Sequence, residues 1–429
     1  VNKNSLSDVR IFQALILNDS KMEKIIVYFL KLIVLMAINF GNCMNNSSFS
    51  TSSSSSSSSP LDHVVIVIRH GDRAPLISFP FDRTKMDELW PMGYGHLTAE
   101  GKRRMYRLGS FLRRRYHRRL PGKLLTPRDV YIRSSAIERC LESSELIAAS
   151  LCPPQGVWIW NTNLGEQWQP LPIHSVPKYR DGLLNPASHC VRADKLSEQI
   201  LFSSTVRKYW QEQKDFIQNV TNSLDQSLRN HREVRDLYDN LLILKHHGKR
   251  LPQWARNPTV YNRLKSIFHH SFRFDYTSMI EKDLKKLRTG MLLMEIFERL
   301  HPIATPKTNP ETKKISIFVT HDSQLFHLYD ALGLLNDKTS FKFGTMLIFE
   351  YSKENDALRL WQVNSTKASD LFRFDRKELI VTSDCFDREN NVTKLSCLRA
   401  KMKPLFLTED QWNLECWNTP TSTIKHLGL

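Results

Sequence analysis

Largely apolar runs that end in a polar turn and lead into a helical pattern restrict the fold of this chain more than any other feature. Three runs read as buried strands: residues 64–68, 130–132 and 315–320. Each is followed by apolar residues at helical spacing, in residues 98–119, 136–151 and 323–335. This alternation predicts an α/β fold with a central, mostly parallel sheet flanked by helices.

The remaining segments suggest how this fold is divided. Residues 346–351 and 358–363 resemble a late β-hairpin. Strands fade between about 175 and 300, where long charged helical segments occupy residues 192–228, 234–244 and 279–300. We therefore expect an α/β domain built from residues 61–174 and 301–416, interrupted by a mainly helical cap at 175–300, with residues 417–429 as a C-terminal tail.

The first 60 residues are expected to lie outside this domain. Residues 22–43 start with charged residues and continue as an apolar run, which is typical of a secretory signal peptide. The run is short and interrupted by Lys31, so it suits a membrane span poorly, although an uncleaved signal anchor is the alternative. Residues 1–21 then form an upstream extension, and residues 44–60, with their serine tract, a flexible linker. No stable membrane span is expected in the mature form.

Cysteines and sequons fit the same secretory route. One of the seven cysteines, Cys43, falls in the signal segment, and the other six are Cys140, Cys152, Cys190, Cys385, Cys397 and Cys416. Asn-x-Ser/Thr sequons, which are glycosylation acceptors in a secreted chain, start at Asn219, Asn364 and Asn391. No Cys-x-x-Cys motif occurs, so we expect no metal site. The predicted localisation is secreted or lysosomal.

The positive charge is concentrated in one segment. The chain carries 61 Lys and Arg against 44 Asp and Glu, a net charge of +17. Residues 101–128 alone contain eleven basic side chains and no acidic one. No nucleic-acid-binding motif accompanies them, so we expect no nucleic-acid partner and interpret the segment as the solvated face of a long helix. The alternative is that it attracts anionic substrates or surfaces.

The sequence Arg-His-Gly-Asp-Arg-Ala-Pro at residues 69–75 follows the first predicted strand directly. In open α/β sheets, ligands bind at the carboxyl ends of the strands. Two guanidinium groups beside one imidazole are unusual in a protein core. They are well suited to hold a phosphate group by paired hydrogen bonds around a nucleophile.

The other two predicted strands also end in chemically active residues. Arg133 follows residues 130–132, and His321 and Asp322 follow residues 315–320. If the three strands are neighbours in a parallel sheet, their ends gather one candidate site: Arg69, His70, Arg73, Arg133, His321 and Asp322. Such a set fits a phosphate dianion, with one imidazole to attack phosphorus and one carboxyl group to protonate the leaving oxygen.

These motifs resemble the histidine acid phosphatase family, nearest its prostatic and lysosomal branch. The family signature Arg-His-Gly-x-Arg-x-Pro stands intact at residues 69–75, and residues 90–101 are similar to the segment that follows it. His321 and Asp322 resemble the family's catalytic His-Asp pair, and Arg133 its second phosphate arginine. The resemblance covers residues 61–416 and implies a phosphoglycerate-mutase-like sheet with a helical cap and no cofactor.

The resemblance also implies a role for each site residue. His70 would attack phosphorus and form a phosphohistidine. The phosphate oxygens would be held by Arg69, Arg73, Arg133 and His321. Asp322 would protonate the leaving alcohol and then help to activate water. Because such an acid must be protonated to donate, the implied activity is hydrolysis of orthophosphoric monoesters, either small molecules or phosphoproteins, at acidic pH.

Several supporting features follow from the same comparison. The resemblance implies the disulfides Cys190–Cys416 and Cys385–Cys397, and a homodimer, since relatives dimerise. Cys140 and Cys152 would lie about 18 Å apart on one continuous helix, beyond the ~7 Å that a disulfide spans. They are therefore expected to be buried thiols, unless that helix ends early.

Not every residue near these motifs is expected to act in catalysis, and parts of the motifs also occur in proteins of different function. Asp72 is expected to support the turn, and His174 to pack. A mutase-like phosphotransferase shares the Arg-His-Gly start, but Arg73, Pro75, the signal segment and the cap disfavour it. Phytases tend to carry His-Ala-Glu in place of the His-Asp pair. Two further functions stay open: a secreted phosphate-ligand-binding protein without turnover, and a narrower phosphatase for lysophospholipids or inositol phosphates.

Overall fold

The computed structural model describes nine segments of the chain: residues 60–79, 88–121, 125–224, 226–276, 282–301, 313–336, 339–365, 374–381 and 383–417. They all belong to one compact unit, Ser59–Leu429. The predicted extension 1–21, signal peptide 22–43, almost all of the linker and all but the first residue of the tail lie outside the described residues. No helix within the described segments is long and apolar enough to cross a membrane.

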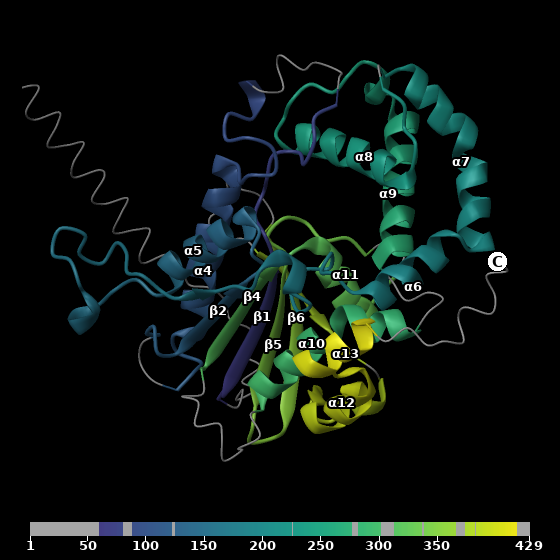
Figure 1. Cartoon of the computed structure of the whole chain (residues 1–429). Helices are drawn as coiled ribbons and strands as arrows, with labels where there is room; N and C mark the ends of the chain where they lie inside the picture. Colours follow the sequence, from purple (N-terminus) through teal and green to yellow (C-terminus); the bar gives the residue numbers. More distant parts are fainter. Residues whose placement is uncertain are drawn as a thin grey trace, which may run out of the picture. The chain divides into compact units, whose positions relative to one another are not determined.

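A mixed sheet of nine strands forms the centre of this unit (Figure 1). Its order is β3-β2-β4-β1-β5-β6-β9-β8, and β7 also pairs with β6. The strands are β1 (His63–Arg69), β2 (Val130–Ser134), β3 (Ile173–His174), β4 (Ile315–Thr320), β5 (Met346–Ser352), β6 (Ala357–Ser365), β7 (Phe374–Leu379), β8 (Phe386–Asp387) and β9 (Val392–Lys394). Strands β3, β2, β4 and β1 run parallel, whereas β5 to β9 pair in antiparallel fashion. The predicted α/β fold is therefore confirmed, with the predicted hairpin present as β5 and β6.

The register of the parallel strands brings their carboxyl ends together. Arg69 at the end of β1 pairs with Thr320 at the end of β4, and Ser134 at the end of β2 pairs with Val319. The residues that follow β1 and β4 consequently leave the sheet side by side. The ends of the three predicted strands thus meet at one edge of the sheet, as the candidate site requires.

The α-helices of the described segments are α4 (Ala99–Tyr116), α5 (Glu138–Leu151), α6 (Val191–Leu201), α7 (Ser204–Asn222), α8 (His231–His246), α9 (Pro258–Tyr276), α10 (Lys282–Leu300), α11 (Asp322–Ala331), α12 (Leu395–Met402) and α13 (Glu409–Trp417). On one face of β1, Ile66 packs in a core with Met105 of α4 and Ile147 of α5. On the other face, Val67 packs in a core with Ile296 of α10. Because β1 is covered on both faces, its sequence is continuously apolar rather than alternating.

The cap differs from its predicted outline. The helical pattern at 192–228 is two helices, α6 and α7, separated where Ser203 caps α7 by accepting a hydrogen bond from the backbone N–H of Val206 over 3.4 Å. Helix α9 was not predicted. Helix α10, which the sequence analysis assigned to the cap, packs against the sheet instead. The helices that form separate cores above the site are α7, α8 and α9 (Figure 1).

Two disulfides connect described parts of the chain, in the pairings that the family resemblance implied. Cys190–Cys416 joins the residue before α6 to α13, and Cys385–Cys397 closes a short loop next to α12. Cys140 and Cys152 are free and buried, at the two ends of α5. Burial raises the pKa of each thiol to about 12, so both are un-ionised and unreactive at physiological pH.

The basic segment is only partly a solvated helix face. Arg103, Arg113 and Arg114 are exposed on α4. Arg104 and Arg115, in contrast, point inward and form ion pairs with the buried acids Asp72 and Glu350. Arg119 also pairs with Glu350, so three members of the basic run neutralise carboxylates inside the protein, which helical spacing alone did not indicate.

Candidate active site

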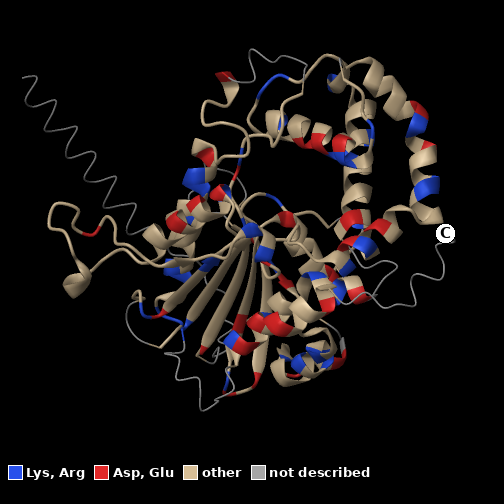
Figure 2. Ribbon diagram, viewed as in Figure 1, with Lys and Arg blue, Asp and Glu red and all other residues tan. Residues whose placement is uncertain are grey.

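The candidate site is a pocket of about 400 Å³ at the carboxyl ends of β1 and β4. In Figure 2, Lys and Arg positions meet Asp and Glu positions above these strand ends. The pocket is lined by four of the six predicted residues, His70, Arg73, His321 and Asp322. It is also lined by Arg139, which the sequence analysis missed, and by residues of α8 and α9.

His70 lines the pocket and is held with one ring nitrogen unprotonated. The ring is 2% exposed, and Nδ1 donates a hydrogen bond to the carbonyl oxygen of Gly71 over 2.8 Å. This bond leaves Nε2 unprotonated, as a nucleophile requires. Burial, with the charges of Arg139, Arg69, His321 and Arg73, lowers the pKa of His70 well below its usual value. The imidazole therefore stays neutral in acidic solution.

Arg139 lies in the first turn of α5, which follows β2. Its Nε donates a hydrogen bond to Nε2 of His70 over 3.1 Å, and its Nη2 donates to Nδ1 of His321 over 3.4 Å. A strand leads directly into a helix here, so the first helical turn lies at the same sheet edge as the strand end. That topology is the signal that could have identified Arg139 from the sequence.

Arg133 is placed differently from its predicted partners. Its Nη2 donates to Oδ1 of Asp181 over 2.9 Å, and it is not among the residues that line the pocket. The Asp181 carboxylate is fully buried, so the arginine neutralises an internal acid. The structure thus brings together five of the six predicted residues, all except Arg133. The guanidinium group that follows β2 and contacts His70 is that of Arg139.

Arg69 and Asp322 form an ion pair beside the nucleophile. Arg69 Nη2 lies 2.7 Å from Asp322 Oδ2, while Nη1 donates to the carbonyl oxygen of Phe341 over 2.5 Å. Burial by itself would raise the pKa of Asp322, but Arg69, Arg73 and His321 together lower it below its usual value. This arrangement therefore favours the ionised carboxyl group.

His321 contributes a second buried imidazole. Its Nε2 hydrogen bonds with the hydroxyl of Ser135 over 3.2 Å, and its ring meets that of His70 edge-on with centroids 5.6 Å apart. Burial, followed by the charge of Arg139, lowers its pKa to about 3. His321 is thus a neutral hydrogen-bonding group at the pH of an acidic compartment.

The cap supplies a partner for Arg73. Arg73 Nη1 and Nη2 donate to the two carboxylate oxygens of Asp239, on α8, over 2.9 and 3.2 Å. Such a two-point contact fixes the plane of the guanidinium as well as its position. Asp239 was not predicted, because nothing near it in the sequence links α8 to residues 69–75.

Asp72 supports the signature loop from behind. Its fully buried carboxylate accepts hydrogen bonds from Arg104 Nε over 2.5 Å and is 2.6 Å from Nε2 of His246, on α8. Burial opposes ionisation, but His246 and Arg104 lower the pKa of Asp72 to about 2. A Cβ on Gly101 would lie 2.1 Å from the carbonyl oxygen of Asp72, so only glycine lets α4 approach the loop this closely.

One cluster of possible metal ligands adjoins this network. Glu100, His246 and His247 offer ligand atoms that lie within 4.8 Å of one another. The atoms are already engaged, because His246 Nε2 contacts Asp72 and Arg104 Nη2 contacts Glu100 over 3.3 Å. A guanidinium in direct contact with one ligand opposes a second cation, so we assign no metal to this cluster.

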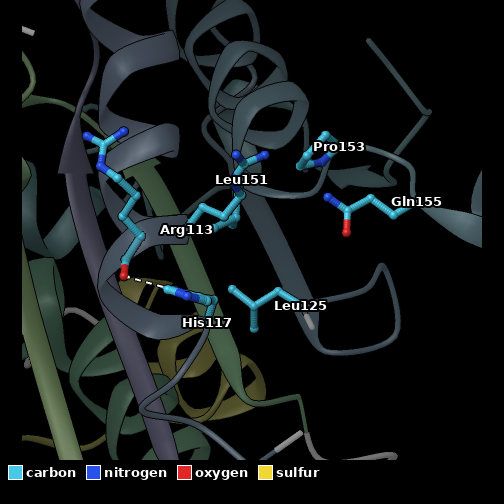
Figure 3. Close-up of a pocket in the computed structure, with 7 residues that line it drawn as sticks. Arg113, His117, Leu125, Leu151, Pro153 and Gln155 are labelled. Carbon is cyan, nitrogen blue, oxygen red and sulfur yellow. Dashed lines mark hydrogen bonds between the residues drawn. The ribbon is translucent and has the colours of Figure 1, made fainter. Parts of the chain in front are cut away.

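A smaller pocket of about 240 Å³ lies away from these residues (Figure 3). It is bordered by Arg113, Arg114 and His117 of α4 and its end, and by the apolar Leu125 and Leu151. His117 Nδ1 donates to the carbonyl oxygen of Arg114 over 3.0 Å. None of the residues that the sequence singled out for phosphate chemistry borders it, so we place the reaction in the larger pocket.

Comparison with known proteins agrees with this geometry. The family model of the histidine phosphatase superfamily (branch 2) matches residues 60–368, so the chain belongs to that family. It is 34% identical over 305 residues to lysosomal acid phosphatase of Bos taurus, covering 69% of this chain and 68% of that protein. It is 35% identical over 280 residues to prostatic acid phosphatase of Bos taurus, covering 64% and 70%. These relatives favour an acid phosphatase over a binding protein without turnover or a narrower phosphatase.

Solved structures support the fold independently. The phytase of Citrobacter braakii superimposes with a TM-score of 0.60 at 18% identity, covering 84% of this chain and all of that one. The apo phytase of Hafnia alvei gives a TM-score of 0.59 at 18% identity, covering 82% and 98%. At this level of identity the likeness concerns the fold alone.

Proposed function

We propose that this protein hydrolyses orthophosphoric monoesters at acidic pH through a phosphohistidine on His70. One observation carries the proposal: the unprotonated Nε2 of His70, the guanidinium groups of Arg73 and Arg139, and the carboxyl group of Asp322 border one pocket. Family membership and the acid phosphatase relatives point to the same chemistry.

In the first step, His70 Nε2 attacks phosphorus and forms a P–N bond while the ester P–O bond breaks. Arg69, Arg73 and Arg139 offset the charge on the non-bridging oxygens, and His321 provides a further polar contact. Asp322 gives its proton to the leaving alcohol. In the second step, water attacks phosphorus, Asp322 takes the proton of that water, and the P–N bond breaks to release phosphate.

This sequence accounts for an acidic pH range. Phosphate would bring negative charge next to Asp322 and compete with it for Arg69, which would raise the pKa of the carboxyl group. Acidic solution then populates the protonated carboxyl group that the first step consumes. His70 meanwhile remains neutral because burial and neighbouring cations hold its pKa well below the usual value.

A secretory location and the modifications that accompany it belong to the same proposal. Two disulfides are typical of an oxidising compartment, and the relatives are named as lysosomal or prostatic enzymes. Asn219 and Asn391 are exposed and would accept glycans. Asn364, in β6, is half-buried and its amide oxygen accepts a hydrogen bond from Thr345 Oγ1 over 2.7 Å, but a glycan would attach to its amide nitrogen, so Asn364 remains the third expected acceptor. The homodimer remains an expectation that a sizing experiment would test.

The test combines turnover with trapping of the intermediate. The purified protein should hydrolyse p-nitrophenyl phosphate at about pH 5 with a chelator present, and the His70→Ala variant should not. Radiolabelled substrate, quenched during turnover in alkaline denaturant that preserves phosphoramidates, should leave label on the peptide containing His70. The His174→Ala variant, altered at an exposed histidine, is the matched control and should keep activity and label. Label on another residue, or turnover without His70, would refute the proposal.

A further inference from the structure

The wall of the active-site pocket carries a carboxylate without a protein partner. Asp236 lies on α8, lines the pocket and is half-buried. Among the described residues, no side chain or backbone group hydrogen bonds to its carboxylate or forms an ion pair with it. An unpaired acid is unexpected in a pocket that binds phosphate esters, because it repels any additional negative charge on the substrate.

The neighbouring charges are already neutralised by other residues. Asp239, one helical turn further on α8, pairs with Arg73. Arg235, beside Asp236 in the sequence, pairs with Asp275 and lies over the rings of Phe272 and Tyr276 at 5.4 and 5.5 Å. Burial raises the pKa of Asp236, and the nearby charges of Arg235 and Arg73 oppose this rise, but neither arginine forms an ion pair with its carboxylate.

Two cations that have no acidic partner in the described part of the chain also line the pocket, and they differ in position. Arg139 contacts His70 and so belongs to the phosphate centre. Lys178 is exposed, where water and salt weaken its interactions. Asp236 is thus the half-buried charge that could interact with the leaving alcohol of the substrate. Asp236 and Asp239 are three residues apart on α8, so their Cβ atoms lie about 5–6 Å apart. Because Asp239 pairs with Arg73, Asp236 lies close to the phosphate group that Arg73 would bind.

We propose that Asp236 selects phosphomonoesters whose alcohol carries an ammonium group. The phosphate would occupy the centre at His70 while the ammonium group pairs with the carboxylate one helical turn from Asp239. This inference rests on the proposed phosphatase function and specifies its substrate class. The same carboxylate disfavours leaving groups that carry a second phosphate or a carboxylate.

The test compares substrates that differ only in this charge. The first pair is O-phosphoethanolamine and propyl phosphate, in which an ammonium group replaces a methyl group of similar size. The second pair, 4-aminobutyl phosphate and pentyl phosphate, covers a longer reach. Because an ammonium group also makes the alcohol a better leaving group, the diagnostic quantity is how the ratio of kcat/KM within a pair changes on mutation.

The Asp236→Asn variant should lower that ratio about three- to tenfold for at least one pair, since it removes the charge and keeps the shape. The loss should shrink as salt is raised to about 1 M. The Asp215→Asn variant is the matched control, because Asp215 is an exposed acid on α7 outside the pocket, and it should leave both ratios unchanged.

The outcomes separate this inference from the function on which it rests. If the wild-type protein hydrolyses p-nitrophenyl phosphate but Asp236→Asn leaves both ratios unchanged, the role of Asp236 is refuted and the phosphatase proposal stands. An equal change in Asp215→Asn would also refute it, since a general effect of cap charge would then suffice. If folded wild-type protein hydrolyses no phosphomonoester, both proposals fail together.

Discussion

Arg139 donates a hydrogen bond to the nucleophilic nitrogen of His70 over 3.1 Å, although the two residues lie 69 positions apart. The guanidinium group therefore stands where the phosphate of a substrate would meet His70. Arg133, six residues earlier, is paired with Asp181 and does not line the pocket. The two arginines offer a matched comparison within one strand–helix segment.

Replacing Arg139 with alanine should lower kcat about 10²- to 10³-fold, by analogy with the loss of one donor to a developing oxyanion. Replacing Arg133 with alanine should change kcat only a few-fold, but should lower the melting temperature because the buried carboxylate of Asp181 loses its partner. Steady-state kinetics and thermal unfolding of both variants measure the contrast. Equal losses of kcat would show that Arg133 also acts on the substrate.

Asp322→Asn should impair poor leaving groups more than good ones. The variant cannot protonate the departing alcohol, so kcat for an alkyl phosphate should fall about 10²- to 10⁴-fold. The loss should be smaller for p-nitrophenyl phosphate, whose phenolate leaves without a proton. Measuring kcat across phosphates of alcohols with graded pKa values tests this, and an equal loss for every leaving group would contradict a role as general acid.

The contact between His246 and Asp72 should make stability depend on pH. His246 faces Asp72, Glu100 and Arg104, and its hydrogen bond to Asp72 raises its pKa. Its contribution is therefore complete below the unfolded pKa and is lost as the pH rises through the higher folded pKa. The pKa of Asp72 is lowered to about 2, so its contribution is complete above the unfolded pKa of about 4 and is lost only as the pH falls towards 2.

Thermal unfolding of His246→Gln beside the wild type measures the first of these effects. The difference in melting temperature should be largest near pH 5 and should shrink above about pH 7. His174→Gln, at an exposed histidine, provides the control and should show no such trend. A difference for His246→Gln that stays constant across this range would mean that the contact contributes by packing rather than by charge.

The two disulfides should differ in their effect on stability. In the chain-entropy view, Cys190–Cys416, which joins residues 226 apart, contributes about 5 kcal/mol, and Cys385–Cys397, which joins residues 12 apart, about 3 kcal/mol. Paired Cys→Ser variants should thus lower the free energy of unfolding more for the longer connection. Denaturant titration measures both, and the reverse order would point to native-state packing as the dominant contribution.

The central sheet and most of the site could be predicted because their signals are local. Strands β1 and β4 are buried on both faces, so they read as apolar runs, and their chemical residues follow at once in the sequence. For β2 the sequence pattern indicates Arg133, the first arginine after the apolar run. The arginine that reaches His70 lies after the turn, in the first turn of α5, and its position depends on how that helix docks.

The contribution of the cap could not be predicted for a related reason. Asp239 is 166 residues from Arg73, and His246 is 174 residues from Asp72. Helical periodicity predicts that α8 exists, but it does not indicate which of its turns meets residues 69–75. Only the packing of the cap cores determines that register.

Helix α8 holds the signature loop at two neighbouring points, Arg73 through Asp239 and Asp72 through His246. It also presents Asp236 to the pocket. The insertion is consequently not an interchangeable module. Replacing the cap with that of a relative, in order to change substrate specificity, would also remove the contacts that hold residues 69–75 in place. Those contacts would persist only if the new cap kept both Asp239 and His246.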